Sequence, residues 1–195
     1  MSAGRPLEFD PQRALQAAVD VFWRKGYEAT SLQDLLAAMD LSKSSFYQTF
    51  GSKRELFERC LELFRERQAG KMMKALKAAP SGRQFLRATL LSLADEARRS
   101  VPPKGCLIMN TATEFSSRDP AVAALVADGA RAFVRVFRAA VVRAQDEGDI
   151  PLDKNADALA NYLVATVSGL RTMVKAGMRP AEIEGIADVA LRALE

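Results

Sequence analysis

The sequence contains no histidine and only two cysteines among its 195 residues. Without histidine, imidazole-based catalytic triads, histidine metal ligands and a histidine pH switch are all excluded. The two cysteines, Cys60 and Cys106, are far apart and form no CxxC pair. This usage fits a reducing compartment and argues against a disulfide framework or a Cys-rich zinc site. We therefore expect a reduced protein that needs no cofactor.

Long apolar runs are also missing. The longest uncharged stretch that looks helical, Ala158 to Leu170, is shorter than the roughly 20 residues of a membrane span. The first residues include Arg5, Glu8 and Asp10 and lack the apolar core of a signal peptide. We expect a cytoplasmic protein without a membrane partner.

Catalytic motifs are the third absence. The sequence has no GxGxxG fingerprint, no Walker loop and no GxSxG motif. Its adjacent carboxylates, such as Asp95 and Glu96, fit solvated pairs on helix surfaces. We therefore do not expect an enzyme.

The net charge of +4 is unevenly distributed along the chain. Residues 59–104 contain eleven basic and four acidic side chains, whereas residues 1–58 contain seven basic and eight acidic ones. A basic excess of this kind fits a solvated helix face as well as a nucleic-acid partner. Nucleic-acid binding must therefore be judged from the local pattern.

What is present is helix punctuation, which predicts an all-α fold of about nine helices. Asp10–Pro11 and Asp119–Pro120 pair an N-cap with proline at the first helical position. Capping boxes are expected at Thr30–Gln33 and Ser52–Glu55, and Asp153 is expected to cap a later helix. We find no sustained strand alternation. The expected helices cover approximately residues 11–25, 30–39, 42–50, 52–79, 81–100, 105–116, 119–148, 153–177 and 180–194.

The second and third helices have the spacing of a helix-turn-helix, because only a few residues around Asp40–Leu41 join them. Phe46 and Phe50, four residues apart, predict a buried face against Phe22 and Leu35. The other side chains of the third helix are small or hydrogen-bonding, with no acid among them: Lys43, Ser44, Ser45, Tyr47, Gln48 and Thr49. A helix that begins at Ser42 also presents N–H groups that favour phosphate.

These residues carry a resemblance. The segments Gly26–Leu35 and Leu41–Leu56 resemble the N-terminal DNA-binding domain of the TetR family of transcriptional regulators. The most specific part is the spacing Tyr-x-x-Phe-x-x-Lys-x-x-Leu from Tyr47 to Leu56, and the resemblance covers about residues 10–58. Gly105–Leu107 and Gly169–Leu170 are similar, more loosely, to pieces of the family's ligand domain.

The resemblance implies a domain organisation and a function. Residues 1–51 would form the DNA-binding domain, and residues 52–195 a ligand-binding and dimerisation domain. The implied protein is a homodimer that represses from operator DNA and is released by a small molecule. A transcriptional activator on the same fold remains an alternative, as does an all-α ligand-binding or thiol-stress protein without operator binding.

Carried over by position, the resemblance also implies DNA contacts. Lys43 and Ser44 would reach base edges, with Gln33 and Gln48 as further candidates. Thr49 stands where many family members have histidine, so its contact could be weaker or absent, while Tyr47 could be a core side chain and Lys53 a solvated one. The residues expected to hold phosphates are Thr30, Ser42, Ser45, Tyr47, Thr49 and Lys53.

The later helices supply candidates for an effector pocket. Most apolar residues at helical spacing are plain core, but polar groups on such faces, as at Asn110 and Thr113, need partners. No cluster of charges is evident, so we expect a small, largely apolar effector of unknown identity. The candidates are Phe85, Cys106, Met109, Asn110, Thr113, Phe137, Tyr162, Thr166 and Met173.

Cys106 has a second interpretation. It is expected in the first turn of a helix just after Lys104, where the dipole and nearby cations lower a thiol pKa. Cys106 could therefore be a redox or electrophile sensor, so that modification of this cysteine, rather than an effector, releases the operator. The alternative is a small buried apolar side chain.

Apolar stripes on the last two helices predict the dimer interface, although they could serve the monomer core alone. A dimer is favoured because a helix-turn-helix usually reads two half-sites. The long fourth helix would link the two domains, with Gly70 as a possible bend. The expected interface residues are Leu159, Leu163, Val167, Leu170, Val174, Ile183, Ile186 and Leu194.

Overall fold

The computed structural model describes residues 9–99, 102–115 and 119–195. In this part of the chain there are nine α-helices and no strand, as the sequence predicted. None of the helices found there is long and apolar enough to cross a membrane. The helices are α1 (Pro11–Lys25), α2 (Leu32–Met39), α3 (Lys43–Phe50), α4 (Lys53–Ala78), α5 (Gly82–Arg98), α6 (Leu107–Phe115), α7 (Pro120–Asp146), α8 (Ala156–Lys175) and α9 (Pro180–Arg192).

Side-chain caps explain where most of these helices begin. Asp10 accepts a hydrogen bond from the Gln12 amide, and the Ser52–Glu55 capping box forms as expected. Two expected caps were wrong. The box of α2 is Ser31 with Asp34, one residue later than predicted, and Asn155 rather than Asp153 caps α8. In both cases a nearby side chain takes the position: serine caps better than threonine, and asparagine caps as well as aspartate.

Two helix ends differ in another way. Cys106 lies just before α6 instead of in its first turn, and its carbonyl accepts the Asn110 amide. The expected ends of the fifth and sixth helices, at Ser100 and Ser116, lie outside the described residues.

Gly70 does not interrupt α4, which continues as one helix for 26 residues, or about 39 Å at 1.5 Å per residue.

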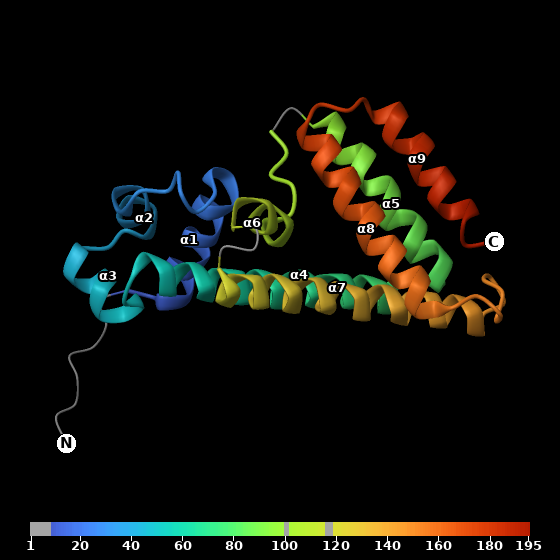
Figure 1. Cartoon of the computed structure of the whole chain (residues 1–195), viewed down its shortest axis with the longest axis horizontal. Helices are drawn as coiled ribbons and strands as arrows, with labels where there is room; N and C mark the ends of the chain where they lie inside the picture. The colour runs from blue at the N-terminus through green and yellow to red at the C-terminus, as the bar shows by residue number, and fades with distance from the viewer. Residues whose placement is uncertain (1–8, 100–101, 116–118) are drawn as a thin grey trace, which may run out of the picture.

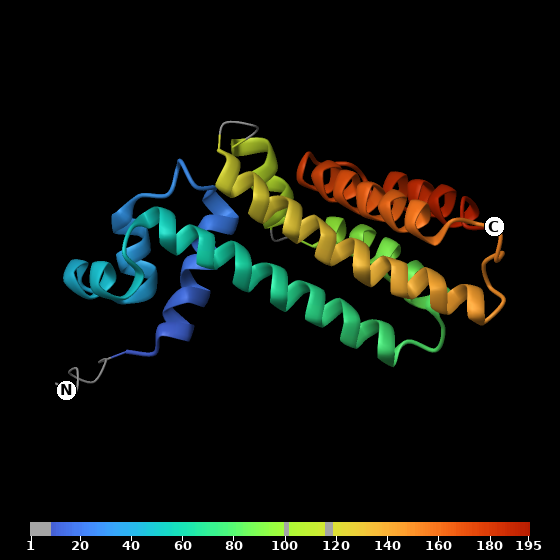
Figure 2. The ribbon, with the colours of Figure 1, turned by 60° about the horizontal axis from the view of Figure 1, so that its bottom comes forward.

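The helices are arranged in two groups joined lengthwise. α1, α2 and α3 gather at one end of the molecule, and α5, α8 and α9 lie at the other (Figure 1). α4 and α7 extend along the molecule between them, and α6 lies beside α1 (Figure 1). Turning the molecule shows α8 and α9 on an outer face, on the side away from α4 (Figure 2).

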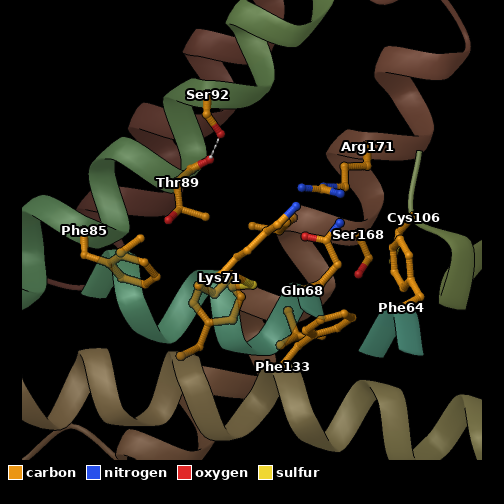
Figure 3. A pocket seen from close by; sticks show the side chains of 15 residues that line it. Phe64, Gln68, Lys71, Phe85, Thr89, Ser92, Cys106, Phe133, Ser168 and Arg171 are labelled. Carbon is orange, nitrogen blue, oxygen red and sulfur yellow. Dashed lines mark hydrogen bonds between the residues drawn. The ribbon is translucent and has the colours of Figure 1, made fainter. Parts of the chain in front are cut away.

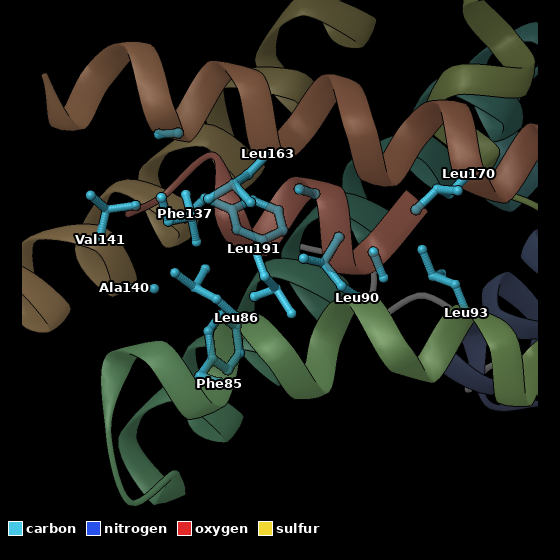
Figure 4. Packing of buried hydrophobic residues seen from close by; sticks show 14 of the residues in the cluster. Phe85, Leu86, Leu90, Leu93, Phe137, Ala140, Val141, Leu163, Leu170 and Leu191 are labelled. Carbon is cyan, nitrogen blue, oxygen red and sulfur yellow. The ribbon is translucent and has the colours of Figure 1, made fainter. Parts of the chain in front are cut away.

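Each group has its own apolar core. The first combines α1–α3 with the first half of α4, α6 and the start of α7, and in it the rings of Phe22 and Phe57 lie 4.9 Å apart. The second combines the end of α4 with α5, α7, α8 and α9. There Leu86, Leu90 and Leu93 follow one face of α5 toward α8 and α9 (Figure 4).

α7 fixes the far end of α4 and the start of α5. The Arg143 guanidinium donates to the carbonyls of Leu76, Ala79 and Pro80, at 2.7, 3.1 and 3.1 Å, and so satisfies the carbonyls around the end of α4. Gly82 lets α5 approach α7, since a Cβ there would lie 2.5 Å from the Ala140 carbonyl oxygen. These contacts set the spacing between α4, α5 and α7.

Candidate DNA-binding surface and ligand cavity

α3 presents a polar face to solvent. Phe46 and Phe50 are buried in the first core, at 0% and 3% exposure, as their spacing predicted. Tyr47 is 49% exposed, which excludes the core interpretation of its ring. Of the remaining candidates on and before α3, Ser42, Lys43, Ser44 and Gln48 are exposed, and Ser45 and Thr49 are half-buried.

Three hydroxyl groups cluster at the beginning of α3. The Ser42 Oγ accepts the Ser45 amide at 3.2 Å and lies 3.1 Å from Ser44 Oγ and 2.9 Å from Ser45 Oγ. Ser42 therefore has a structural role as the cap, while the hydroxyls beside it stay close to solvent. A helix N-terminus with adjacent hydroxyl donors can bind a phosphate oxygen.

Thr30 does not belong to this surface. Its side chain is 1% exposed, and its hydroxyl donates to the Gly26 carbonyl at 2.5 Å. The prediction of a phosphate contact is corrected here: because the capping box begins at Ser31, Thr30 turns inward and closes the turn after α1. Gln33, on α2, is exposed and remains a candidate.

Charged side chains lie near α3 on the helices that flank it. Asp34, the acid of α2, lies 2.6 Å from Lys25 Nζ, and this hydrogen bond together with those from Ser31 lowers its pKa to about 2. Lys53, at the start of α4, lies 4.3 Å from the centroid of the Tyr27 ring. Arg59, which sequence reasoning missed, donates to the Thr49 carbonyl at 3.1 Å and ties the end of α3 to α4.

α6 is joined to α1 by polar contacts. The Trp23 indole donates to the Gly105 carbonyl at 3.1 Å, and Lys104 pairs with Asp20 at 3.0 Å. Glu114 accepts the amides of Tyr27 and Glu28, at 3.0 and 2.7 Å. The segment around α6 therefore contacts both α1 and the start of the turn that leads into α2.

A cavity of about 220 Å³ lies between α4, α5, α7, α8 and the residue before α6 (Figure 3). Phe85, Cys106 and Phe137 line it, as predicted. The complete lining consists of Phe64, Gln68, Lys71, Met72, Ala75, Phe85, Thr89, Ser92, Cys106, Phe133, Phe137, Val164, Val167, Ser168 and Arg171.

The other six pocket candidates lie elsewhere. Asn110 donates its side-chain amide to the Lys104 carbonyl at 2.9 Å, and Thr113 is exposed and bonded to the Asn110 carbonyl, so both polar groups are satisfied locally. Tyr162 and Met173 are 37% and 46% exposed on the outer face of α8. Met109 and Thr166 are half-buried and do not line the cavity.

Sequence reasoning also missed the polar residues of the lining. Helical spacing could have found two of them, because Ser168 and Arg171 follow Val164 at intervals of four and seven residues on α8. Gln68 and Lys71 lie three residues apart on α4, within a basic segment that hides them. The available signal was Arg171, an arginine inside an otherwise uncharged helix segment.

Cys106 is a buried thiol whose environment opposes ionisation. It is 7% exposed, and burial raises its pKa above the ordinary value, although hydrogen bonds from the amides of Met109 and Ile108 and the charge of Arg171 oppose this rise. The expected lowering of the pKa was wrong because desolvation outweighs the helix terminus and the nearby cation. Cys60 is fully buried, and burial raises its pKa as well.

The predicted interface residues are mostly core. The buried members of this set pack inside the chain, because the stripe that they form faces α5 and α7. Among the predicted interface residues, only Ile186 is exposed, at 38%. A different face of α8 and α9 is open and apolar, with Tyr162, Met173, Ile186 and Val189 exposed. Leu159 and Val167 are half-buried against the core, and the buried residues are Leu163, Leu170, Val174, Ile183 and Leu194.

Comparisons with known proteins agree with this architecture over 98% of the chain. A family model described as bacterial regulatory proteins of the tetR family matches residues 14–60, and one described as a tetracyclin repressor-like C-terminal domain matches residues 82–189. The uncharacterized HTH-type transcriptional regulator YezE of Bacillus subtilis is 31% identical over 98% of this chain and 100% of its own length.

Two further relatives have more informative names. The HTH-type transcriptional repressor ComR of Escherichia coli is 29% identical over 98% of this chain and 91% of its own length. The TetR family regulator CifR, solved as a cysteine mutant complexed with 26bp double-strand operator DNA, superposes with a TM-score of 0.82. It is 29% identical, and the match covers 98% of this chain and 100% of that one. The chain therefore belongs to the TetR family of transcriptional regulators.

Proposed function

We propose that the protein is a homodimeric repressor that binds operator DNA through α3 and is released when a small effector fills the cavity. The observation that carries the proposal is the exposed face of α3, on which Lys43, Tyr47 and Gln48 stand without an acid among them. Lysine and glutamine are suited to guanine and adenine edges, and the tyrosine hydroxyl to phosphate.

Relatives support both the DNA partner and the sign of regulation. CifR is described in complex with operator DNA, and ComR is named a repressor. Neither name fixes the operator or the effector of this chain. We infer that the protein represses transcription. Transcription from the operator in vitro distinguishes the two signs, because a repressor lowers the amount of transcript and an activator raises it.

The open face of α8 and α9 supports a homodimer. Tyr162, Met173, Ile186 and Val189 are large apolar side chains exposed on these two helices, and a contiguous exposed apolar patch marks an interaction site. A second copy that covers this face through a two-fold axis along the length of the molecule would place both α3 helices at the same end of the dimer. Two half-sites about 34–36 Å apart could then be read together.

The contacts of α6 support a route from the cavity to α3. Cys106, in the cavity wall, lies between Lys104 and the start of α6, and Gly105 beside it accepts the Trp23 indole. A ligand that displaces this segment would shift α1, while a shift of α4 would act directly on α3. Linkage requires that operator DNA weakens effector binding by the same factor.

We favour an effector over modification of Cys106. A thiol with a raised pKa forms little thiolate at neutral pH, and thiolate is the reactive form. The cavity, in contrast, offers apolar walls and polar groups in one place. Cys106 is then part of the cavity wall, and it needs no reaction to take part in release.

The first experiment is a fluorescence-anisotropy titration of the purified protein with DNA from upstream of its own gene and with unrelated DNA, at low and moderate salt. We expect tight, sequence-selective binding that weakens steeply with salt because counterions are released. The Lys43→Ala, Tyr47→Ala variant should lose this binding. Lys77→Ala, which removes an exposed lysine far along α4, is the matched control and should retain it.

If binding is weak and equal on both DNAs, and a selection from random sequence also enriches no site, operator binding is rejected. The all-α ligand-binding interpretation would then stand. If the variant binds as well as the wild type but selectively, DNA binding stands and the assignment of α3 as the recognition helix is wrong.

A further inference from the structure

The lining of the cavity is unbalanced in charge. In the part of the chain that the structure describes, two of its residues are cationic, Lys71 and Arg171, and none is acidic. The remaining polar residues, including Gln68 and Ser168, are neutral groups that can donate hydrogen bonds. The walls around them are largely aromatic and aliphatic.

Arg171 is the unusual member of this set. Its Nε is buried and has no hydrogen-bond partner among the described residues, and no acid there pairs with its guanidinium. Arg171 as a whole is half-buried, and a cationic N–H group that is removed from water without an acceptor is costly. Arginine side chains stay protonated in proteins, so the loss of a proton does not remove this desolvation penalty.

The other donors lie where they can share one ligand group with Arg171. Figure 3 shows the nitrogen ends of Lys71 and Arg171 directed into the space between α4, α5 and α8, with Gln68 beside them. Arg171 and Ser168 come from α8, whereas Lys71 and Gln68 come from α4. An anion held here would therefore bridge the two helices.

We propose that the effector is a small organic monoanion: a carboxylate held by Arg171, with Lys71 and Gln68, on a single ring or short branched apolar body. The inference rests on the proposed function, since it names the effector class of the same cavity. A guanidinium matches a carboxylate in a two-pronged arrangement. This replaces the expectation of a largely apolar effector with a specific charge requirement.

The size of the cavity suits a small apolar ligand body. A cavity of about 150 Å³ takes up benzene. The cavity here, about 220 Å³, has room for one ring with a short substituent. Phe64, Phe85, Phe133 and Phe137 line it and would contact such a ring.

The test measures ligand binding without DNA, so that it succeeds or fails independently of operator binding. Phenylacetate, its neutral analogue phenylacetamide and the cation benzylammonium are titrated into the full-length protein by calorimetry. Quenching of Trp23, the single tryptophan, provides a second signal because its indole is bonded to Gly105 beside the cavity. Arg171→Met and Arg171→Lys are compared with Arg135→Met, a control at an exposed arginine of α7.

We expect phenylacetate to bind at least about tenfold more tightly than phenylacetamide, a difference of the size that one charge-assisted pair supplies. Benzylammonium should not bind. Arg171→Met should abolish the preference for the acid, Arg171→Lys should keep part of it, and Arg135→Met should leave it unchanged.

Three results would overturn the inference: equal or tighter binding of the amide, no binding of the acid at millimolar concentration, or an acid preference that survives in Arg171→Met. Circular dichroism spectra of each variant check that it is folded. If Arg171→Met does not fold, the wild-type ranking of the three probes and the result for Arg171→Lys decide.

Discussion

Arg54, in the first turn of α4, donates two hydrogen bonds to the carboxylate of Asp119, the residue that caps α7. The distance from Arg54 Nη2 to Asp119 Oδ1 is 2.8 Å, and Arg54 Nη1 pairs with Oδ2. The same carboxylate accepts the amides of Ala121 and Val122, each at 3.1 Å. One side chain thus joins the start of the helix that follows α3 to the start of a helix that walls the cavity.

The Arg54–Asp119 pair predicts a pH dependence of stability. The hydrogen bonds from Arg54 and from the amide of Val122 hold the pKa of Asp119 at about 2, below its ordinary value of 3.8. Ionised Asp119 therefore stabilises the folded state above about pH 4, and this contribution is lost as the pH falls toward 2. Asp119→Asn keeps a capping side chain but loses the charge.

We expect Asp119→Asn to melt at a lower temperature than the wild type at pH 7, and the gap to narrow as the pH falls below 4. Thermal melts followed by circular dichroism at pH 7, 5, 4 and 3 measure this. A gap that stays constant over this range would show that the charge of Asp119 does not contribute.

Thr30→Val tests the correction at Thr30. The buried hydroxyl would be lost, leaving the Gly26 carbonyl without its 2.5 Å donor, so we expect a loss of about 1 kcal/mol in the free energy of unfolding. Operator affinity should stay within about twofold of wild type, well below the effect of a lost contact. Urea unfolding and anisotropy measure the two quantities.

Tyr47→Phe is the matched variant, because the ring of Tyr47 is half-exposed on α3. We expect this variant to lose operator affinity with little change in the free energy of unfolding. If Thr30→Val weakens DNA binding without changing stability, Thr30 contacts DNA after all.

Val189→Asp tests the dimer face. Val189 is 54% exposed on α9, so a charge there costs the monomer little but would be buried between two copies. We expect the variant to be monomeric by sedimentation equilibrium and to lose tight operator binding. Leu152→Asp is the control, since Leu152 is 79% exposed in the turn before α8. A dimeric Val189→Asp protein would place the interface elsewhere.

Alkylation distinguishes a cavity wall from a thiol sensor. Burial raises the pKa of both cysteines, so at pH 7 iodoacetamide should modify each more slowly than it modifies free cysteine. Cys106 should react before Cys60, because it lines the cavity, and phenylacetate should protect Cys106 alone. Peptide mass mapping gives both rates. Reaction of Cys106 faster than free cysteine would instead support modification as the signal.

The sequence predicted the local features of this fold well. Helix starts at Asp10, Ser52 and Asp119 follow from capping, which depends on residues within one turn. Capping preference was less decisive at Thr30 and Ser31, where two candidate caps are adjacent. The structure shows that Ser31 is the cap. The burial of Phe46 and Phe50 was also predictable, because helix α3 is short and has one apolar pair.

The cavity and the open face of α8 depended on tertiary structure. An apolar stripe has the same spacing whether it faces its own core or a second copy, so Leu163 and Leu170 could not be distinguished from Tyr162 and Met173 by period alone. Likewise, the pKa of Cys106 depends on burial by helices that are distant in sequence. Whether Arg171 has an acidic partner also depends on which side chains the packing brings near it. The sequence by itself determined the helices, the family and the polar face of α3, because those follow from neighbours along the chain. Only the packing of α4, α5, α7 and α8 decided which residues share the cavity.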